Sequence, residues 1–201
     1  GFNPGTSPNV PVASFRGINC ITVQPDGKIL VGGEFTSWNG TARKCMVRLH
    51  TDGSLDTSFP NLDSFVDVFS GGNANGVRSI AICPSDSAPH FTILVGGGFR
   101  EATGNPGFRS GLIRFHADGT EDSSFVVPYG AHAAGANNNL RIVTSLAVQP
   151  DRKILVGGQF TGFNNVNASR LARLTSTGSN DSAFISNLGV GINSSNGEVS
   201  R

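Results

Sequence analysis

Short runs of apolar residues recur along the chain in the pattern expected of β-strands. The run Ile29-Leu30-Val31 has no polar alternation, and similar runs begin at Ile93 and Ile154. Such a run predicts a strand that is covered on both faces, because a sheet with one face in water shows apolar and polar residues in alternation. We therefore expect these three strands to lie inside a stack of sheets.

The three runs belong to three copies of a longer unit. They begin 64 and 61 residues apart, and each is followed by a second shared block, at residues 48–59, 114–125 and 173–184. Periodicity of this size is typical of repeat architectures, in which one unit cannot bury its apolar surface alone and stacks on its neighbours.

Within the first copy the pattern predicts four antiparallel strands. They cover residues 18–23, 29–31 and 46–49, and a fourth begins at residue 55. The dipeptides Asp26-Gly27 and Asp52-Gly53 predict two-residue hairpin turns, since both residue types tolerate positive φ. We predict an all-β fold of about three complete propeller blades with partial blades at both ends, a segment of a larger β-propeller.

The copies define a single repeat domain over residues 1–201. We expect a tail of a preceding unit at residues 1–16, repeat 1 at 17–75, repeat 2 at 76–139, repeat 3 at 140–196 and the start of a further unit at 197–201. Phe2 falls where Phe59 falls in repeat 1. Because closed propellers have about four to eight blades, we expect a fragment of a longer protein, or a chain that completes its ring with another chain.

Paired glycines, an arginine and an aspartate recur at equal positions in every copy. A residue needed once for catalysis need not recur, whereas one that ties strands or blades together should. We interpret the glycines as sites of close backbone approach and the charged residues as ion pairs or turn caps. Two-residue hairpin geometry puts Arg48 and Asp56 on opposite faces, which favours partners in neighbouring blades. The positions are Gly32, Gly33, Arg48, Asp56, Gly96, Gly97, Arg114, Asp122, Gly157, Gly158, Arg173 and Asp181.

Composition excludes several functional classes. The net charge is +1 without a basic run, which argues against a nucleic-acid partner. No stretch of about eighteen apolar residues is present, so we expect no membrane insertion. The three cysteines lack metal-ligand spacing, and we expect no metal and no cofactor.

Binding residues are expected on the face that carries the connections between strands two and three and between strands four and one. These connections are longer than the Asp-Gly turns, and variable loops on a repeated scaffold commonly carry function. Aromatic and basic side chains there suit stacking on sugars or anchoring a protein, although an ordinary role as loop residues stays open. The candidates are Trp38, Arg43, Phe108, Arg109, Tyr129 and His132.

The motif at residues 23–36, followed by residues 39–43 and 48–59, resembles the delta-60 repeat family of predicted β-propeller units. The resemblance covers nearly the whole chain. It implies a large secreted or surface-exposed bacterial protein with tandem units, and no established enzymatic activity. Repeat 2 departs from the motif because Ser85 to Thr92 replaces the tight turn and Glu121 replaces the leucine, so its first hairpin loop should protrude.

Three hypotheses about function follow. We expect a noncatalytic scaffold or interaction module of a secreted or cell-surface bacterial protein that binds a glycan or a protein. One alternative is a propeller-type lyase or hydrolase with a site at the centre of the ring, and another is a self-assembling extracellular array. The expected partners include further repeats of the same protein, or another copy that completes the ring.

Overall fold

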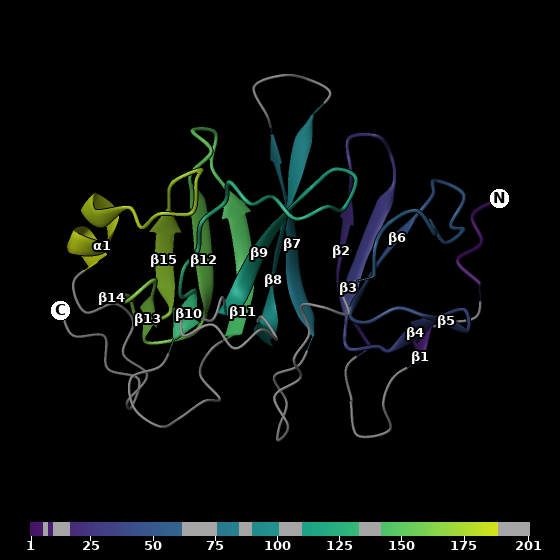
Figure 1. Cartoon of the computed structure of the whole chain (residues 1–201), viewed down its shortest axis with the longest axis horizontal. Coiled ribbons are helices and arrows are strands. Elements are labelled where there is room, and N and C mark those ends of the chain that lie inside the picture. Colours follow the sequence, from purple (N-terminus) through teal and green to yellow (C-terminus); the bar gives the residue numbers. More distant parts are fainter. Residues whose placement is uncertain are drawn as a thin grey trace.

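The computed structural model describes residues 1–5, 8–9, 17–61, 76–84, 90–100, 110–132 and 142–188, and these residues are almost entirely strands and turns (Figure 1). One short helix, α1 (Ser182–Leu188), ends the described part of repeat 3. None of the described helical residues forms a helix long and apolar enough to cross a membrane.

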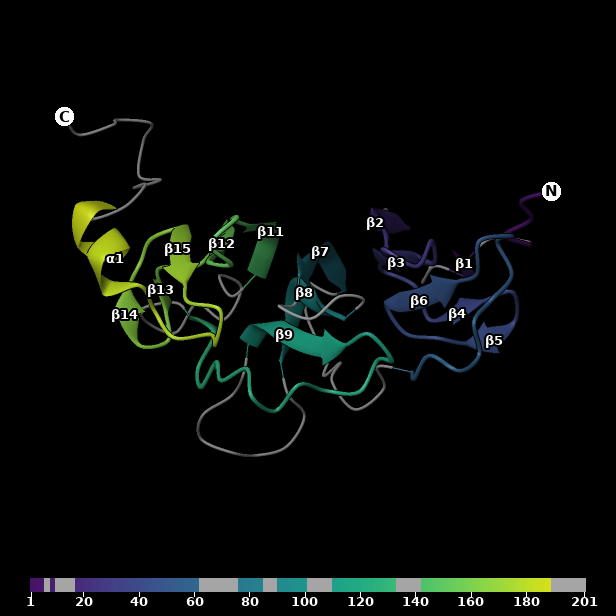
Figure 2. The same ribbon diagram turned by 90° about the horizontal axis from the view of Figure 1, so that it is seen from above.

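Each repeat forms a three-stranded antiparallel sheet whose middle strand contains the apolar run. The strands are β2 (Ile18–Val23), β3 (Ile29–Gly33) and β6 (Met46–Leu49) in repeat 1, β7 (Val77–Pro84), β8 (Phe91–Arg100) and β9 (Ser110–His116) in repeat 2, and β11 (Ile142–Val148), β12 (Ile154–Gln159) and β15 (Leu171–Leu174) in repeat 3. The predicted all-β fold of repeated antiparallel units is therefore confirmed. Seen from above, the sheets fan out from the side where β2, β7 and β11 lie (Figure 2).

The expected fourth strand is reduced to one β-bridge per repeat in the described residues. The bridges join Leu49 to Leu55, Phe115 to Glu121, and Leu174 to Asn180. Directly after the first bridge, Asp56 accepts hydrogen bonds from the backbone and hydroxyl of Ser58, at 3.1 and 2.5 Å. This local turn competes with sheet pairing, so the chain leaves the sheet instead of extending it.

Two small sheets lie on the side opposite the Asp-Gly turns (Figure 1). One contains β1 (Pro8–Asn9), β4 (Ser37–Trp38) and β5 (Thr41–Ala42), and the other contains β10 (Ala131–His132), β13 (Gly162–Phe163) and β14 (Val166–Asn167). The turn of the first hairpin has positive φ at Asn39 (48°) and Gly40 (76°), as a type I′ hairpin requires. The connection that the sequence marked as a loop is thus partly a hairpin.

The middle strand of one repeat packs against the first strand of the next repeat, β3 on β7 and β8 on β11. One hydrophobic cluster joins Leu30 and Met46 of repeat 1 to Ile80 and Ile93 of repeat 2. A second cluster joins Leu94 of repeat 2 to residues of repeat 3. Leu30, Leu94 and Ile93 have no exposed surface, which is the two-sided burial that the uninterrupted apolar runs predicted.

In repeats 1 and 2 the first glycine of the pair makes room for a valine of the next repeat. A Cβ atom added to Gly32 would lie 2.5 Å from Val77 Cγ1, and one added to Gly96 would lie 2.7 Å from Val143 Cγ1. At Gly157 the nearest atom would be Ser145 Cβ, at 3.6 Å. The second glycine approaches backbone instead, because a Cβ at Gly33 would meet the carbonyl oxygen of Gly17.

These contacts predict opposite results for one substitution at two equivalent positions. Gly32→Ala should lower the free energy of unfolding by about 1 to 3 kcal/mol, because the added methyl group overlaps Val77 in a packed core. Gly157→Ala has space for the methyl group and should change it by less than about 1 kcal/mol. Urea denaturation of both variants measures the difference, and equal losses would contradict the packing role of Gly32.

Candidate functional site

An arginine, an aspartate and a phenylalanine form the same cluster in every repeat. The arginine Nε donates to the aspartate Oδ2 at 2.9, 2.8 and 3.0 Å in repeats 1, 2 and 3. The arginine Cζ lies 4.5, 4.4 and 4.4 Å from the centroid of the phenylalanine ring, within the range of a cation–π interaction. The members are Arg48, Asp56 and Phe59, then Arg114, Asp122 and Phe125, then Arg173, Asp181 and Phe184.

Turn length explains why each ion pair forms within one repeat rather than between neighbouring repeats. The backbone N–H of His50 donates to the Ser54 carbonyl at 2.8 Å, so the loop between them has three residues and not the predicted two. Its last residue, Gly53, has φ 91°, as three-residue hairpin loops require. The extra residue shifts the register by one, and Arg48 and Asp56 therefore share a face.

The same arginines also reach the next repeat. Arg48 Nη1 donates to the Ala117 carbonyl at 2.5 Å, and Arg114 Nη1 donates to the Ser176 carbonyl at 2.5 Å. In repeat 3, Arg173 Nη1 instead lies 3.5 Å from Gln149 Oε1 of its own repeat. In repeats 1 and 2 the arginine therefore links its own β-strand to the segment that carries the aspartate and to a turn of the next repeat.

The environment of Asp56 keeps its carboxylate charged. Burial raises the pKa of Asp56, but hydrogen bonds from Ser58 and Lys28 and the guanidinium of Arg48 outweigh burial and hold the pKa well below its ordinary value. The Lys28 Nζ to Asp56 Oδ2 distance is 3.0 Å. The pKa values of Asp122 and Asp181 are lowered too, so the ionised form stabilises the fold in all three repeats.

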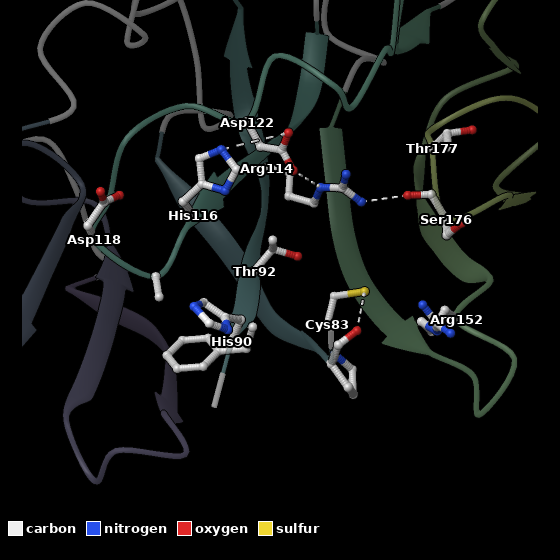
Figure 3. Close-up of a pocket in the computed structure, with 13 residues that line it drawn as sticks. Cys83, His90, Thr92, Arg114, His116, Asp118, Asp122, Arg152, Ser176 and Thr177 are labelled. Carbon is white, nitrogen blue, oxygen red and sulfur yellow. Dashed lines mark hydrogen bonds and ion pairs between the residues drawn. The ribbon is translucent and has the colours of Figure 1, made fainter. Parts of the chain in front are cut away.

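A hollow of about 720 Å³ opens between repeats 2 and 3, on the side of the Asp-Gly turns (Figure 3). It lies between the ends of β7 and β8, the turn after β9 and the turns of repeat 3. Arg114 and Asp122 belong to its wall, and the side chain of His116 is 52% exposed. The polar lining includes His90, Thr92, His116, Asp118, Arg152 and Ser176.

The structure places the four described candidates on the loop side but does not gather them. Trp38 is 3% exposed and packs edge to face on Phe35 at 5.8 Å between ring centroids. Arg43 donates to the Thr57 carbonyl at 3.4 Å, and Tyr129 is 41% exposed. His132 is half-buried in a different small sheet from Trp38. Phe108 and Arg109 lie outside the described residues.

Sequence reasoning placed binding on the loop side and therefore missed the hollow, which opens on the turn side. The signal was present in repeat 2, where an insertion lengthens the hairpin between β7 and β8. That insertion brings His90 and Phe91 to the edge of the hollow. His116 was visible only as the counterpart of His50, since both precede an Asp-Gly turn. The expected protrusion itself falls on residues 85–89, outside the described part.

The cysteines are free thiols, and no disulfide links them. Burial raises the pKa of both the Cys20 and the Cys45 thiol to about 11, so neither is a thiolate at neutral pH and neither is an activated nucleophile. In the described part of the chain, no group of three or more His, Cys, Asp or Glu side chains is placed to hold a metal ion.

Comparison with known families agrees with this architecture. Residues 24–59, 92–125 and 149–184 match the model of a β-propeller domain of unknown function, DUF5122. The three matched segments make up slightly more than half of the 201 residues. No curated protein and no solved structure matches the chain.

Removal of the arginine should cost more in repeat 1 than in repeat 3. The Arg48 and Asp56 side chains are 5% and 3% exposed, against 22% and 11% for Arg173 and Asp181. Arg48→Ala should lower the free energy of unfolding by about 3 kcal/mol, because it leaves the buried carboxylate of Asp56 without its ion-pair partner. Arg173→Ala should cost about 1 to 2 kcal/mol. Chemical denaturation compares the two, and the reverse order would contradict the bridging role of Arg48.

Acid should destabilise the fold through these carboxylates. Their pKa values are lower in the folded chain than the value of about 3.9 expected in the unfolded chain. Their contribution is therefore complete above about pH 5 and is lost as pH falls through the folded pKa values. Thermal unfolding followed by circular dichroism between neutral and acidic pH should show this loss. Asp56→Asn should be less stable at pH 7 yet lose less on acidification, and an unchanged pH dependence would exclude Asp56 as a contributor.

Proposed function

This chain belongs to the DUF5122 family of β-propeller domains, and from that membership we propose that it is a noncatalytic scaffold and interaction module. The proposal includes the finer assignment to delta-60 repeats, on the strength of the motif at residues 23–36. It also includes a location on the cell surface or in the secreted fraction of a bacterium, which the same resemblance supports.

One observation carries the scaffold role. In repeats 1 and 2 the arginine and the aspartate meet each other and the arginine meets a carbonyl of the neighbouring repeat, at distances between 2.5 and 2.9 Å, and in repeat 3 the ion pair recurs at 3.0 Å. Catalytic acids and bases need a pKa near the working pH, whereas the pKa values of these aspartates are lowered. The aspartates recur in every repeat and are paired with arginines, and both facts favour a structural role over a role in proton transfer.

The hollow between repeats 2 and 3 is the surface best suited to a ligand. Its volume of about 720 Å³ lies within the usual range of about 300 to 1,000 Å³ for small-molecule sites. His90, His116 and Asp118 are exposed at its rim and offer hydrogen-bond donors and acceptors. A glycan matches this lining, since its many hydroxyl groups both donate and accept.

The loop side supplies a second candidate surface. Tyr129 presents a partly exposed ring there, and an aromatic ring with a hydroxyl group suits either a sugar or a protein partner. Trp38 is no longer a candidate binding residue, because its ring is buried and has no face open for stacking. The enzymatic alternative would gain support from an acid and a base that converge without a structural partner. The array alternative would gain support from pairing of the terminal strands with another molecule.

A glycan array with the wild-type chain tests the proposed binding. We expect a hit whose affinity falls about tenfold in His116→Ala, because one hydrogen bond at the hollow is lost. Tyr129→Ala serves as the matched control on the opposite side and should bind as the wild type does. Loss of binding in Tyr129→Ala alone would move the site to the loop side. Absence of any glycan hit would refute the glycan proposal.

A further inference from the structure

Five turns of the described residues share one conformation, and one of them carries an arginine where the others carry glycine. The last residue of each three-residue loop donates its backbone N–H to the carbonyl three positions earlier, at 2.8 to 3.1 Å. This residue is glycine in four turns, with φ between 82° and 95°, and Arg152 in the fifth, with φ 64°. In this left-handed region a Cβ atom lies too close to the following carbonyl oxygen, so the arginine carries backbone strain that glycine avoids. The four glycines are Gly27, Gly53, Gly119 and Gly178.

The turn itself does not require the arginine. Gly27 stands at the equivalent position of repeat 1, and the same backbone N–H to carbonyl bond closes both loops, at 2.8 Å in each. What distinguishes Arg152 is its place, because it belongs to the wall of the hollow between repeats 2 and 3 (Figure 3). Residues in sparsely populated backbone conformations cluster at ligand sites. The strain and the place of Arg152 therefore indicate the same role, in which its side chain serves the hollow.

The two carboxylates of the hollow do not oppose an anionic ligand beside Arg152. Asp122 accepts from Arg114 Nε at 2.8 Å, so its charge is paired within repeat 2. Asp118 accepts from the backbone N–H and the hydroxyl of Thr120, at 2.8 and 2.7 Å. Figure 3 shows Asp118 and Arg152 on opposite sides of the hollow. A negatively charged group on the Arg152 side would therefore meet a cation and lie away from Asp118.

Hydroxyl groups accompany the arginine on this side of the hollow. Ser176 and Thr177 lie on the Arg152 side (Figure 3), and both residues are exposed. A hydroxyl group both donates and accepts, as the hydroxyl groups of a sugar do. A guanidinium group presents parallel N–H donors that match the two oxygens of a carboxylate. Together these groups suit a sugar that carries a carboxylate.

We propose that Arg152 is a specificity-determining residue of the hollow and that it selects an acidic glycan, one that contains a uronic acid. This inference rests on the proposed glycan binding and narrows it from glycans in general to those with a carboxylate. Arg152 binds the carboxylate, and the hydroxyl groups of Ser176 and Thr177 contact the hydroxyl groups of the same sugar. The strained turn is the cost of placing a cation where repeat 1 has Gly27.

A glycan array that pairs each uronic acid oligosaccharide with its methyl ester tests the proposal. The ester keeps the sugar hydroxyl groups and removes the charge. We expect the wild type to bind an acid about tenfold tighter than its ester, because a charge-assisted hydrogen bond is lost in the ester. Arg152→Gly should bind both alike, with the affinity of the wild type for the ester. Lys44→Gln removes one positive charge at an exposed position outside the hollow. It is the matched control and should keep the full preference for the acid.

Urea denaturation of the same variants separates a binding role from a structural one. Arg152→Gly puts glycine into the left-handed conformation that glycine adopts without strain, so the denaturation midpoint should stay unchanged or rise. A clear fall of the midpoint would show that the arginine side chain holds the fold and would overturn the proposal. Equal binding of acid and ester by the wild type, or a preference that Arg152→Gly retains, would also overturn it while glycan binding itself still stands. If neither acids nor esters bind, the proposed glycan binding fails and this proposal fails with it.

Discussion

The packing of each sheet against the sheet of the neighbouring repeat is the constraint on which the rest of this structure depends. Leu30 and Leu94 lose all contact with water only because the next repeat covers them. That approach requires glycine at positions 32 and 96, where a side chain would collide with a valine of the neighbour. Hydrophobic burial supplies the driving force, and the paired glycines set how near the sheets can come. A single repeat would satisfy neither condition.

The arginine cluster adds direction to this packing. Apolar contact between sheets is not directional, so it does not by itself fix how one sheet is aligned with the next. A guanidinium group has a fixed fork of donors, and Arg48 directs one arm to Asp56 and another to the Ala117 carbonyl. These two bonds hold the segment around Asp56 and the turn around Ala117 in a fixed relative orientation. The same contact recurs between repeats 2 and 3 through Arg114.

Much of the fold was predictable from the sequence, because repetition exposes structural roles. The runs at Ile29, Ile93 and Ile154 indicated doubly covered strands, and the structure shows this for the run of repeat 2, where Ile93 and Leu94 are fully buried, whereas Leu155 of repeat 3 stays half-buried. Turn length was not predictable, since Asp52-Gly53 suits both two-residue and three-residue loops, and the register of Arg48 and Asp56 depended on that choice.

The hollow was missed for a different reason. It forms between repeats, where loop length in one copy and turn geometry in the next combine, so the insertion in repeat 2 indicated a longer hairpin but not the hollow beside it. Trp38 was wrongly expected to be available for binding. An aromatic residue beside a turn looks like a surface residue in the sequence, but the hairpin places the Trp38 ring against Phe35, where it is buried.

The neighbour's contribution to the arginine contact is a main-chain oxygen, and this choice has an evolutionary consequence. Ala117 and Ser176 differ in side chain, yet each offers the same carbonyl to the preceding arginine. A bond to the backbone survives almost any mutation at that position. Copies of such a unit can therefore be duplicated, diverge and change order within a gene while their junctions still fit. The number of units can then vary, provided that the glycine and valine contacts between neighbouring sheets are kept.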